Sequence, residues 1–122
     1  MVFVRRTVLI VDDHAGFRVA ARALLESDGR LDVVGEADNG ADAIRATTRL
    51  HPDIVLLDIV LPDLDGFAVC ESIMSDGSNP PAVVLISSRG PSSYRTRLSA
   101  SPACGFLPKD ELSAATLLAL AR

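Results

Sequence analysis

Hydrophobic residues recur along this chain in two alternating patterns. Short continuous apolar runs, rich in valine, isoleucine and leucine, predict strands that are buried on both faces of a sheet. These runs occupy residues 7–11, 31–37, 54–57, 82–86 and 105–107. Between them, apolar residues recur at helical spacing, as Phe17, Ala20 or Ala21, and Leu24 do. This spacing predicts helices at residues 15–27, 41–50, around 67–74, near 92–100 and at 110–122.

Five strands that alternate with five helices predict parallel βαβ units with right-handed crossovers. The pattern alone leaves the order of the strands in the sheet open. The last predicted helix is apolar at eight of the ten positions from 112 to 121. A helix that is apolar nearly all round is buried or contacts a partner. We therefore expect either a fragment of a longer protein or an exposed docking face around Leu117 and Leu120.

The composition restricts the class of protein further. With 48% hydrophobic residues, the 122-residue chain can bury a core without disulfides or metals. A formal net charge of −4 argues against a protein that binds nucleic acid through its phosphates. Two cysteines, Cys70 and Cys104, are typical of a reducing compartment. No membrane span or signal peptide is visible, so we expect a cytoplasmic domain without a membrane partner.

Polar residues follow the predicted strands at the points where the strands end. They are Asp12 and Asp13 after the first strand, Asp58 after the third, Ser87 and Ser88 after the fourth, and Lys109 after the fifth. Ligands of open α/β sheets bind beyond the carboxyl ends of the strands. We therefore expect these side chains to converge on one site.

Three converging carboxylates stay ionised together only if a cation lies between them. Their oxygens are hard ligands, which favour Mg²⁺. A carboxylate beside a metal ion and a lysine is also the equipment for phosphoryl transfer, in which the carboxylate attacks phosphorus and becomes an aspartyl phosphate. A hydroxyl such as that of Ser87 would hydrogen-bond the transferred group. The site therefore predicts phosphoryl chemistry with Mg²⁺ as the cofactor.

Four segments of the chain resemble the receiver domain of bacterial two-component response regulators. They are VDDH at 11–14, LLDIVLPDLDG at 56–66, LISS at 85–88 and FLPK at 106–109. The resemblance spans residues 6–121 and is strongest to the NarL/FixJ subfamily. It implies a flavodoxin-like (βα)5 three-layer sandwich with a parallel sheet of order 2-1-3-4-5. It also implies that residues 1–122 are the N-terminal receiver of a longer regulator, whose helix-turn-helix DNA-binding domain would follow.

The resemblance also implies a role for each residue of the site. Asp58 would accept a phosphoryl group from a sensor histidine kinase, with Lys109 and Ser87 assisting. Mg²⁺ would be held by Asp12, Asp13, Asp58 and the backbone carbonyl of Val60, and the switch would consist of Ser87 and Phe106. The fourth helix, fifth strand and fifth helix would form a homodimer surface. The domain would act as a signalling switch, not a turnover enzyme, and would control an effector, most directly transcription.

A second hypothesis is a small Mg²⁺-dependent phosphatase that uses Asp58 or Asp63 as nucleophile, because residues 63–66 read DLDG. We favour turn and helix N-cap roles for Asp63 and Asp65, and we interpret His14 as lining the rim of the acidic pocket. The family's usual Lys-Pro order is reversed here as Pro108-Lys109. Because a cis bond to a non-proline residue costs about 2.5–4 kcal/mol, we predict a trans bond after Lys109.

Overall fold

The computed structural model describes residues 4–77 and 79–122. Its strands form one parallel five-stranded sheet in the order β2-β1-β3-β4-β5. The strands are β1 (Arg6–Val11), β2 (Leu31–Ala37), β3 (Ile54–Asp58), β4 (Ala82–Ser87) and β5 (Gly105–Pro108). This arrangement confirms the strand order that the resemblance implies, with β2 and β5 at the two edges of the sheet.

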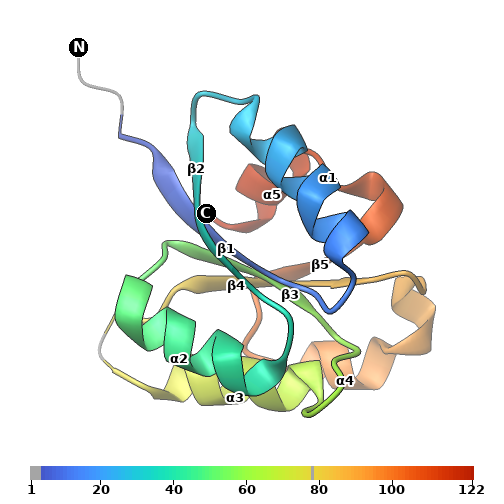
Figure 1. Ribbon diagram of the computed structural model, residues 1–122. Coiled ribbons are helices and arrows are strands. Elements are labelled where there is room, and N and C mark those ends of the chain that lie inside the picture. The colour runs from blue at the N-terminus through green and yellow to red at the C-terminus, as the bar shows by residue number, and fades with distance from the viewer. Residues whose placement is uncertain (1–3, 78) are drawn as a thin grey trace.

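Helices cover both faces of the sheet and complete a three-layer sandwich. They are α1 (Ala15–Glu26), α2 (Gly40–Leu50), α3 (Gly66–Ser75), α4 (Arg95–Ala100) and α5 (Ala114–Leu120). Helices α1 and α5 lie on one face, and α2, α3 and α4 lie on the other (Figure 1). In the part of the chain that the structure describes, no helix has the length and apolar character that crossing a membrane requires.

The sheet separates two hydrophobic cores because alternate strand residues point to opposite faces. From β1, Val8 and Ile10 join the core beneath α1 and α5, whereas Leu9 and Val11 join the core beneath α2 and α3. The central strands β3 and β4 divide their side chains in the same way. These strands are therefore apolar on both faces, which is why their sequences read as continuous hydrophobic runs.

Helix α1 faces the core with a different side from the one that the sequence indicates. Leu25 is fully buried, whereas Leu24 is 43% exposed. Ala21 is buried one turn before Leu25, so the buried stripe follows the spacing of four residues. Val19, at 70% exposure, lies with Leu24 on the outer surface of the helix. The helix thus carries apolar residues on its exposed side as well.

The C-terminal helix also differs from its prediction. A 3-10 turn spans Lys109–Glu111, and α5 starts only after Ser113, whose side chain accepts a hydrogen bond from the backbone N–H of Thr116. Leu117 is fully buried. Leu120 is half-buried, and one of its methyl groups comes within 2.8 Å of where a Cβ on Gly105 would lie. The expected exposed apolar face around Leu117 and Leu120 is therefore wrong, because these leucines pack onto the sheet.

Candidate functional site

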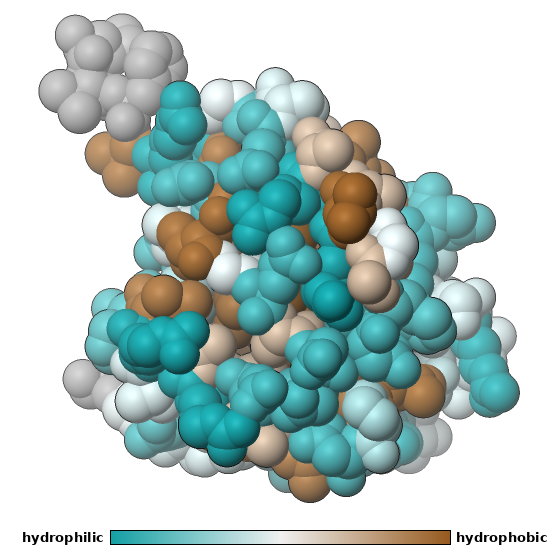
Figure 2. Space-filling model, in the orientation of Figure 1, coloured by the Kyte–Doolittle hydropathy of each residue, from teal (hydrophilic) through white to brown (hydrophobic). Residues whose placement is uncertain are grey.

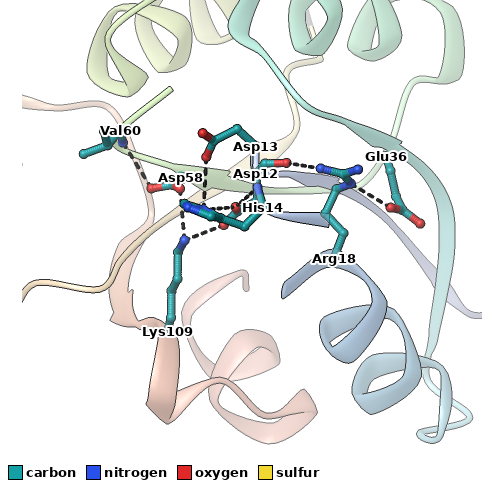
Figure 3. Close-up of polar contacts among 8 residues, drawn as sticks. All are labelled: Asp12, Asp13, His14, Arg18, Glu36, Asp58, Val60 and Lys109. Carbon is teal, nitrogen blue, oxygen red and sulfur yellow. Dashed lines mark hydrogen bonds and ion pairs between the residues drawn. The ribbon is translucent and has the colours of Figure 1, made fainter. Parts of the chain in front are cut away.

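The carboxyl ends of β1, β3 and β5 bring two buried carboxylates and one ammonium group together (Figure 3). Asp12 is completely buried, and Asp58 is 3% exposed. The Lys109 Nζ lies 2.6 Å from Asp12 Oδ2 and 3.1 Å from Asp58 Oδ2. Asp13 contributes a further carboxylate from the more exposed side of the same group. The structure thus assembles these four side chains as the sequence predicts.

The loop that follows β3 fixes the position of Asp58. The backbone N–H of Val60 donates to Asp58 Oδ1 at 3.1 Å, and that of Gly66 donates to the carbonyl of Ile59 at 2.8 Å. A Cβ on residue 66 would lie 2.4 Å from the Asp58 carbonyl oxygen. No side chain fits at that distance, so glycine allows the chain to return this close to the phosphoacceptor candidate. A role for the Val60 carbonyl as a metal ligand stays a prediction.

Burial and neighbouring charges have opposite effects on the pKa values of Asp58 and Lys109. Burial raises the pKa of Asp58, and the bonds from the Val60 N–H and from Lys109 oppose that shift only in part. Burial alone would lower the pKa of Lys109, but its contacts with Asp12 and Asp58 outweigh burial and raise that pKa. Lys109 therefore stays a cation across the physiological range, directly beside Asp58.

The residues present fit a divalent cation. Asp12, Asp13, His14 and Asp58 each offer a ligand atom, and these atoms all lie within 4.8 Å of one another. Asp12 Oδ2 is buried, and its partner among the described residues is the Lys109 ammonium. Carboxylate oxygens in this number suit a hard cation such as Mg²⁺. The imidazole of His14 lies at the rim of the group, as predicted, and contacts both Asp12 and Asp13 there.

Arg18 is a part of the site that sequence reasoning missed. Its Nη1 donates to the backbone carbonyl of Asp12 at 2.6 Å, and its Nε donates to Glu36 Oε1 at 3.0 Å. Glu36 also binds Arg22 at 2.7 Å, and these arginine contacts lower its pKa despite the opposing effect of burial. The network ties the end of β1 to α1 and β2. Its signal in the sequence is weak, because it needs side chains from three separate elements.

Ser87 lies at the end of β4 and is 2% exposed. Its Oγ accepts the backbone N–H of Arg89 at 3.0 Å and lies 3.3 Å from the hydroxyl of Tyr94. The Tyr94 ring packs between two others, with centroids 6.0 Å from Phe67 and 6.3 Å from Phe106. The two candidate switch residues, Ser87 and Phe106, are therefore joined through Tyr94. Sequence reasoning missed this tyrosine, although it is the only one in the chain.

Of the two aspartates of the DLDG segment, Asp65 is a helix N-cap as predicted, whereas Asp63 binds the N-terminus of a helix that is distant in the sequence. Asp65 accepts the backbone N–H of Phe67 at 2.8 Å and begins α3. Asp63 accepts the N–H groups of Gly40 and Ala41 at 2.7 and 3.0 Å, which places its carboxylate at the N-terminus of α2. These bonds from the backbone lower the pKa of Asp63. They also occupy both of its oxygens, so the structure disfavours Asp63 as a nucleophile.

The end of β5 also behaves as predicted. Pro108 pairs only with Ser87 of β4, because β5 is an edge strand, so the missing N–H of proline leaves no partner unbonded. The described residues contain no cis peptide bond, and the bond from Lys109 to Asp110 is therefore trans. The Lys109 side chain reaches both carboxylates from this trans backbone and passes within 4.8 Å of the Phe17 ring centroid.

Comparison with known proteins agrees with this geometry. Residues 8–122 match the family model described as the response regulator receiver domain. The solved receiver domain of NarL from Mycobacterium tuberculosis is 35% identical, with a TM-score of 0.85 and 96% of each chain covered. The transcription regulator BvgA of Bordetella pertussis is 40% identical over 104 residues, which are 85% of this chain but 49% of BvgA.

A relative that is named as an enzyme contains a segment similar to this chain. A protein-glutamate methylesterase/protein-glutamine glutaminase of Halalkalibacterium halodurans is 43% identical over 84 residues, which are 69% of this chain and 24% of that enzyme. The chain spans about half the length of the regulator BvgA and less of the methylesterase. The matched segment is thus shared by proteins of different output, and by its fold, its site and these matches the chain belongs to the response regulator receiver domain family.

Proposed function

We propose that this chain is a phosphorylation switch in which Asp58 accepts a phosphoryl group from a sensor histidine kinase with Mg²⁺ as cofactor. The observation that carries the proposal is the placement of Asp58 at the end of β3, buried, next to Asp12 and within 3.1 Å of the Lys109 ammonium. The receiver family to which the chain belongs supports the same chemistry.

The transfer forms one bond and breaks another. An oxygen of the Asp58 carboxylate attacks phosphorus, and the bond from phosphorus to the imidazole nitrogen of the kinase breaks with its electron pair on that nitrogen. Asp12, Asp13, Asp58 and the Val60 carbonyl would hold Mg²⁺, which neutralises charge on the phosphoryl oxygens when it is bound. Lys109 binds one phosphoryl oxygen, and the Ser87 hydroxyl donates to another. Water later removes the phosphoryl group and restores the carboxylate.

The alternative is a small phosphatase that releases phosphate with turnover. Of its two candidate nucleophiles, Asp63 uses both carboxylate oxygens to cap α2. That leaves Asp58, which serves both hypotheses. The amount of product separates them, because a switch takes up one phosphoryl group per chain from acetyl phosphate, whereas a phosphatase releases phosphate from a phosphoester repeatedly.

We predict that acetyl phosphate with Mg²⁺ labels Asp58 alone, and that chelating the metal with EDTA abolishes the label. Mass spectrometry after borohydride reduction identifies the modified residue. Asp58→Asn loses the label, whereas the matched control Asp63→Asn keeps it because residue 63 lies outside the cluster. Labelling at another residue, labelling without a divalent cation, or multiple turnovers of a phosphoester would contradict the proposal.

The partners of the switch follow from its chemistry. A histidine kinase must bring its phosphohistidine to the edge of the sheet where α1 begins, directly after Asp13 and His14. Helix α1 exposes Val19 about one turn from this edge and Leu24 near its far end, and Figure 2 shows hydrophobic surface over α1 between hydrophilic residues. We propose this surface for kinase docking, because exposed apolar groups mark interaction sites. The cytoplasmic location stays a prediction.

The output of the switch is control of a downstream effector, most directly of transcription, since BvgA is named a transcription regulator. We propose that residues 1–122 are the receiver of such a regulator and that they do not bind DNA themselves, in keeping with the net charge of −4. Phosphorylation would act through a homodimer formed by α4, β5 and α5.

A further inference from the structure

The imidazole of His14 lies within the carboxylate cluster. Its Nδ1 is 3.2 Å from Asp12 Oδ1 and 3.1 Å from Asp13 Oδ1 (Figure 3). The backbone fixes this position, because the N–H of His14 donates to the same Asp12 Oδ1 at 2.8 Å and His14 is the N-cap residue of α1. The side chain is otherwise 71% exposed. Its ring is therefore held against the two carboxylates, although it is not packed into the core.

We propose that His14 is a nitrogen ligand of the divalent cation in this site and that it shifts the preference of the site toward transition metal ions. This inference rests on the cation site of the proposed function. Imidazole suits nickel, copper, zinc and iron, whereas carboxylate and water suit magnesium, calcium and manganese. A cluster of carboxylates alone would lack this added preference for nickel over magnesium.

The distances agree with ligation. Metal–ligand bonds of about 2.1 Å place neighbouring ligands of an octahedron about 3.0 Å apart. The separations of 3.1 and 3.2 Å between Nδ1 and the two carboxylate oxygens match such an edge. Asp12 Oδ2, by contrast, is completely buried and paired with the Lys109 ammonium at 2.6 Å, which leaves Asp12 Oδ1 and Asp13 Oδ1 as the oxygens beside the imidazole.

A competing explanation makes the opposite prediction. If His14 served as a positive counter-charge for Asp12 and Asp13, it would compete with the cation, and its removal would tighten the binding of every metal. If His14 is a ligand, its removal weakens nickel binding and leaves the carboxylates to bind magnesium. The direction of the change therefore separates the two roles.

The experiment is calorimetric titration of the protein with Ni²⁺ and with Mg²⁺. The proteins are the wild type, His14→Ala, His14→Gln and the control His51→Asn. His51 is the only other histidine and caps α2 with φ 48°, a conformation that asparagine tolerates. We expect both His14 variants to lose about tenfold or more in Ni²⁺ affinity, the scale of the loss when support for a ligand is removed, with a much smaller change for Mg²⁺. The control keeps the nickel preference of the wild type.

Spin-echo spectroscopy of bound Mn²⁺ gives a direct readout of the nitrogen. Coupling to an imidazole nitrogen appears in the wild type and in His51→Asn, and disappears in His14→Ala. Unchanged Ni²⁺ affinity with no nitrogen coupling, or tighter binding of both metals by the variants, overturns the inference. Wild-type protein that labels Asp58 from acetyl phosphate with Mg²⁺ but shows no nitrogen coupling overturns the role of His14 alone. Wild-type protein that binds no cation and takes no label overturns the proposed function as well.

Discussion

At the scale of single residues, Asp58 is subject to opposite demands. The proposed function needs an ionised carboxylate that attacks phosphorus, whereas a position at 3% exposure favours the neutral acid. Lys109 at 3.1 Å compensates in part, yet the pKa of Asp58 is still raised, with burial as the main cause and the Asp12 charge as a further one. Keeping the Asp58 carboxylate ionised therefore lowers the free energy of unfolding.

We predict that Asp58→Asn makes the metal-free protein more stable at neutral pH, by roughly 1 kcal/mol, or about 4 °C in melting temperature. The asparagine removes a buried charge and the repulsion with Asp12, and Lys109 keeps its other partner at 2.6 Å. Thermal unfolding followed by circular dichroism in EDTA measures the difference.

The gain in stability that we predict for Asp58→Asn should depend on pH. Because the pKa of Asp58 is raised in the fold, its proton stabilises the native state fully below the ordinary value of 3.8, and that contribution is lost as pH rises through the raised pKa. The advantage of Asp58→Asn should therefore be large at pH 7 and shrink as the pH falls toward 4. Asp110→Asn, an exposed control in the 3-10 turn, removes no buried charge and should not raise the melting temperature at pH 7. A destabilised Asp58→Asn at pH 7 would contradict the argument.

The sequence predicts the core of the site well for a physical reason. Asp12, Asp58 and Lys109 stand at the ends of three strands, and parallel strands leave their carboxyl ends on one edge, so the fold alone brings them together. Tyr94 and Arg18 act from helix ends, where the rotamer and the helical phase decide which way a side chain points. Those quantities depend on tertiary packing, which leaves no pattern in the sequence.

At the scale of elements, α4 is the most weakly held helix. None of its six residues is buried, whereas α3 buries five of its ten. Contacts from Tyr94 and Arg97 fix α4 to the rest of the domain. Arg97 pairs with Asp65 at 2.6 Å and lies 4.3 Å from the centroid of the Phe67 ring. Few buried contacts mark a segment that opens locally at low free energy.

We predict that the backbone amides of α4 exchange with deuterium much faster than those of α3. Tyr94→Ala should speed exchange in α4 further, because it removes the ring between Phe67 and Phe106 and the hydroxyl near Ser87. Tyr94→Phe keeps the ring and should show a smaller effect, which separates packing from the hydrogen bond. Mass spectrometry of peptic fragments measures both. Equal protection of α3 and α4 in the wild type would show that α4 is firmly fixed.

Element boundaries also show where sequence reasoning fails. Helix α4 was expected near residues 92–100, but Pro91–Ser93 forms a 3-10 turn and the α-helix starts at Arg95. Proline fits the first turn of a helix, so its position does not show how far the helix continues. In α1, apolar residues at both 24 and 25 offer two helical phases, and contact with the sheet selects Leu25. The bounds of the strands were predicted more closely, because a strand that is buried on both faces is a continuous apolar run whose ends are visible in the sequence.

At the scale of the whole molecule, the site and the face made by α4, β5 and α5 meet at Ser87. This residue ends β4, pairs with Pro108 of β5, and contacts Tyr94 at the start of α4. A phosphoryl group on Asp58 that draws the Ser87 hydroxyl toward itself would therefore act on both β5 and α4. Ser87 therefore connects the candidate site to this face, which is the output face of the proposed switch.

The amount of apolar surface that α4, β5 and α5 expose determines whether two copies of the protein can associate through this face. The large hydrophobic side chains exposed among the described residues lie elsewhere, on Val4, Val19, Leu24, Val60 and Leu64. On the output face, Leu98 and Phe106 are half-buried and pack against the core beneath α3. Without phosphorylation the face therefore offers little apolar surface to a second copy.

We predict that the protein is a monomer in its free form and becomes a dimer with Mg²⁺ and beryllofluoride, a mimic of the phosphoryl group. Displacement of α4 would expose Leu98 and Phe106 and create the apolar patch that association needs. Light scattering after size exclusion, at several protein concentrations, measures the mass. Leu98→Ala should weaken the dimer, whereas Leu24→Ala on α1 should leave it intact, because α1 contacts β1 and β2, away from the edge strand β5. A strict monomer in both states at high concentration would remove the dimer from the mechanism, and a dimer that responds to Leu24 but not to Leu98 would move it to α1.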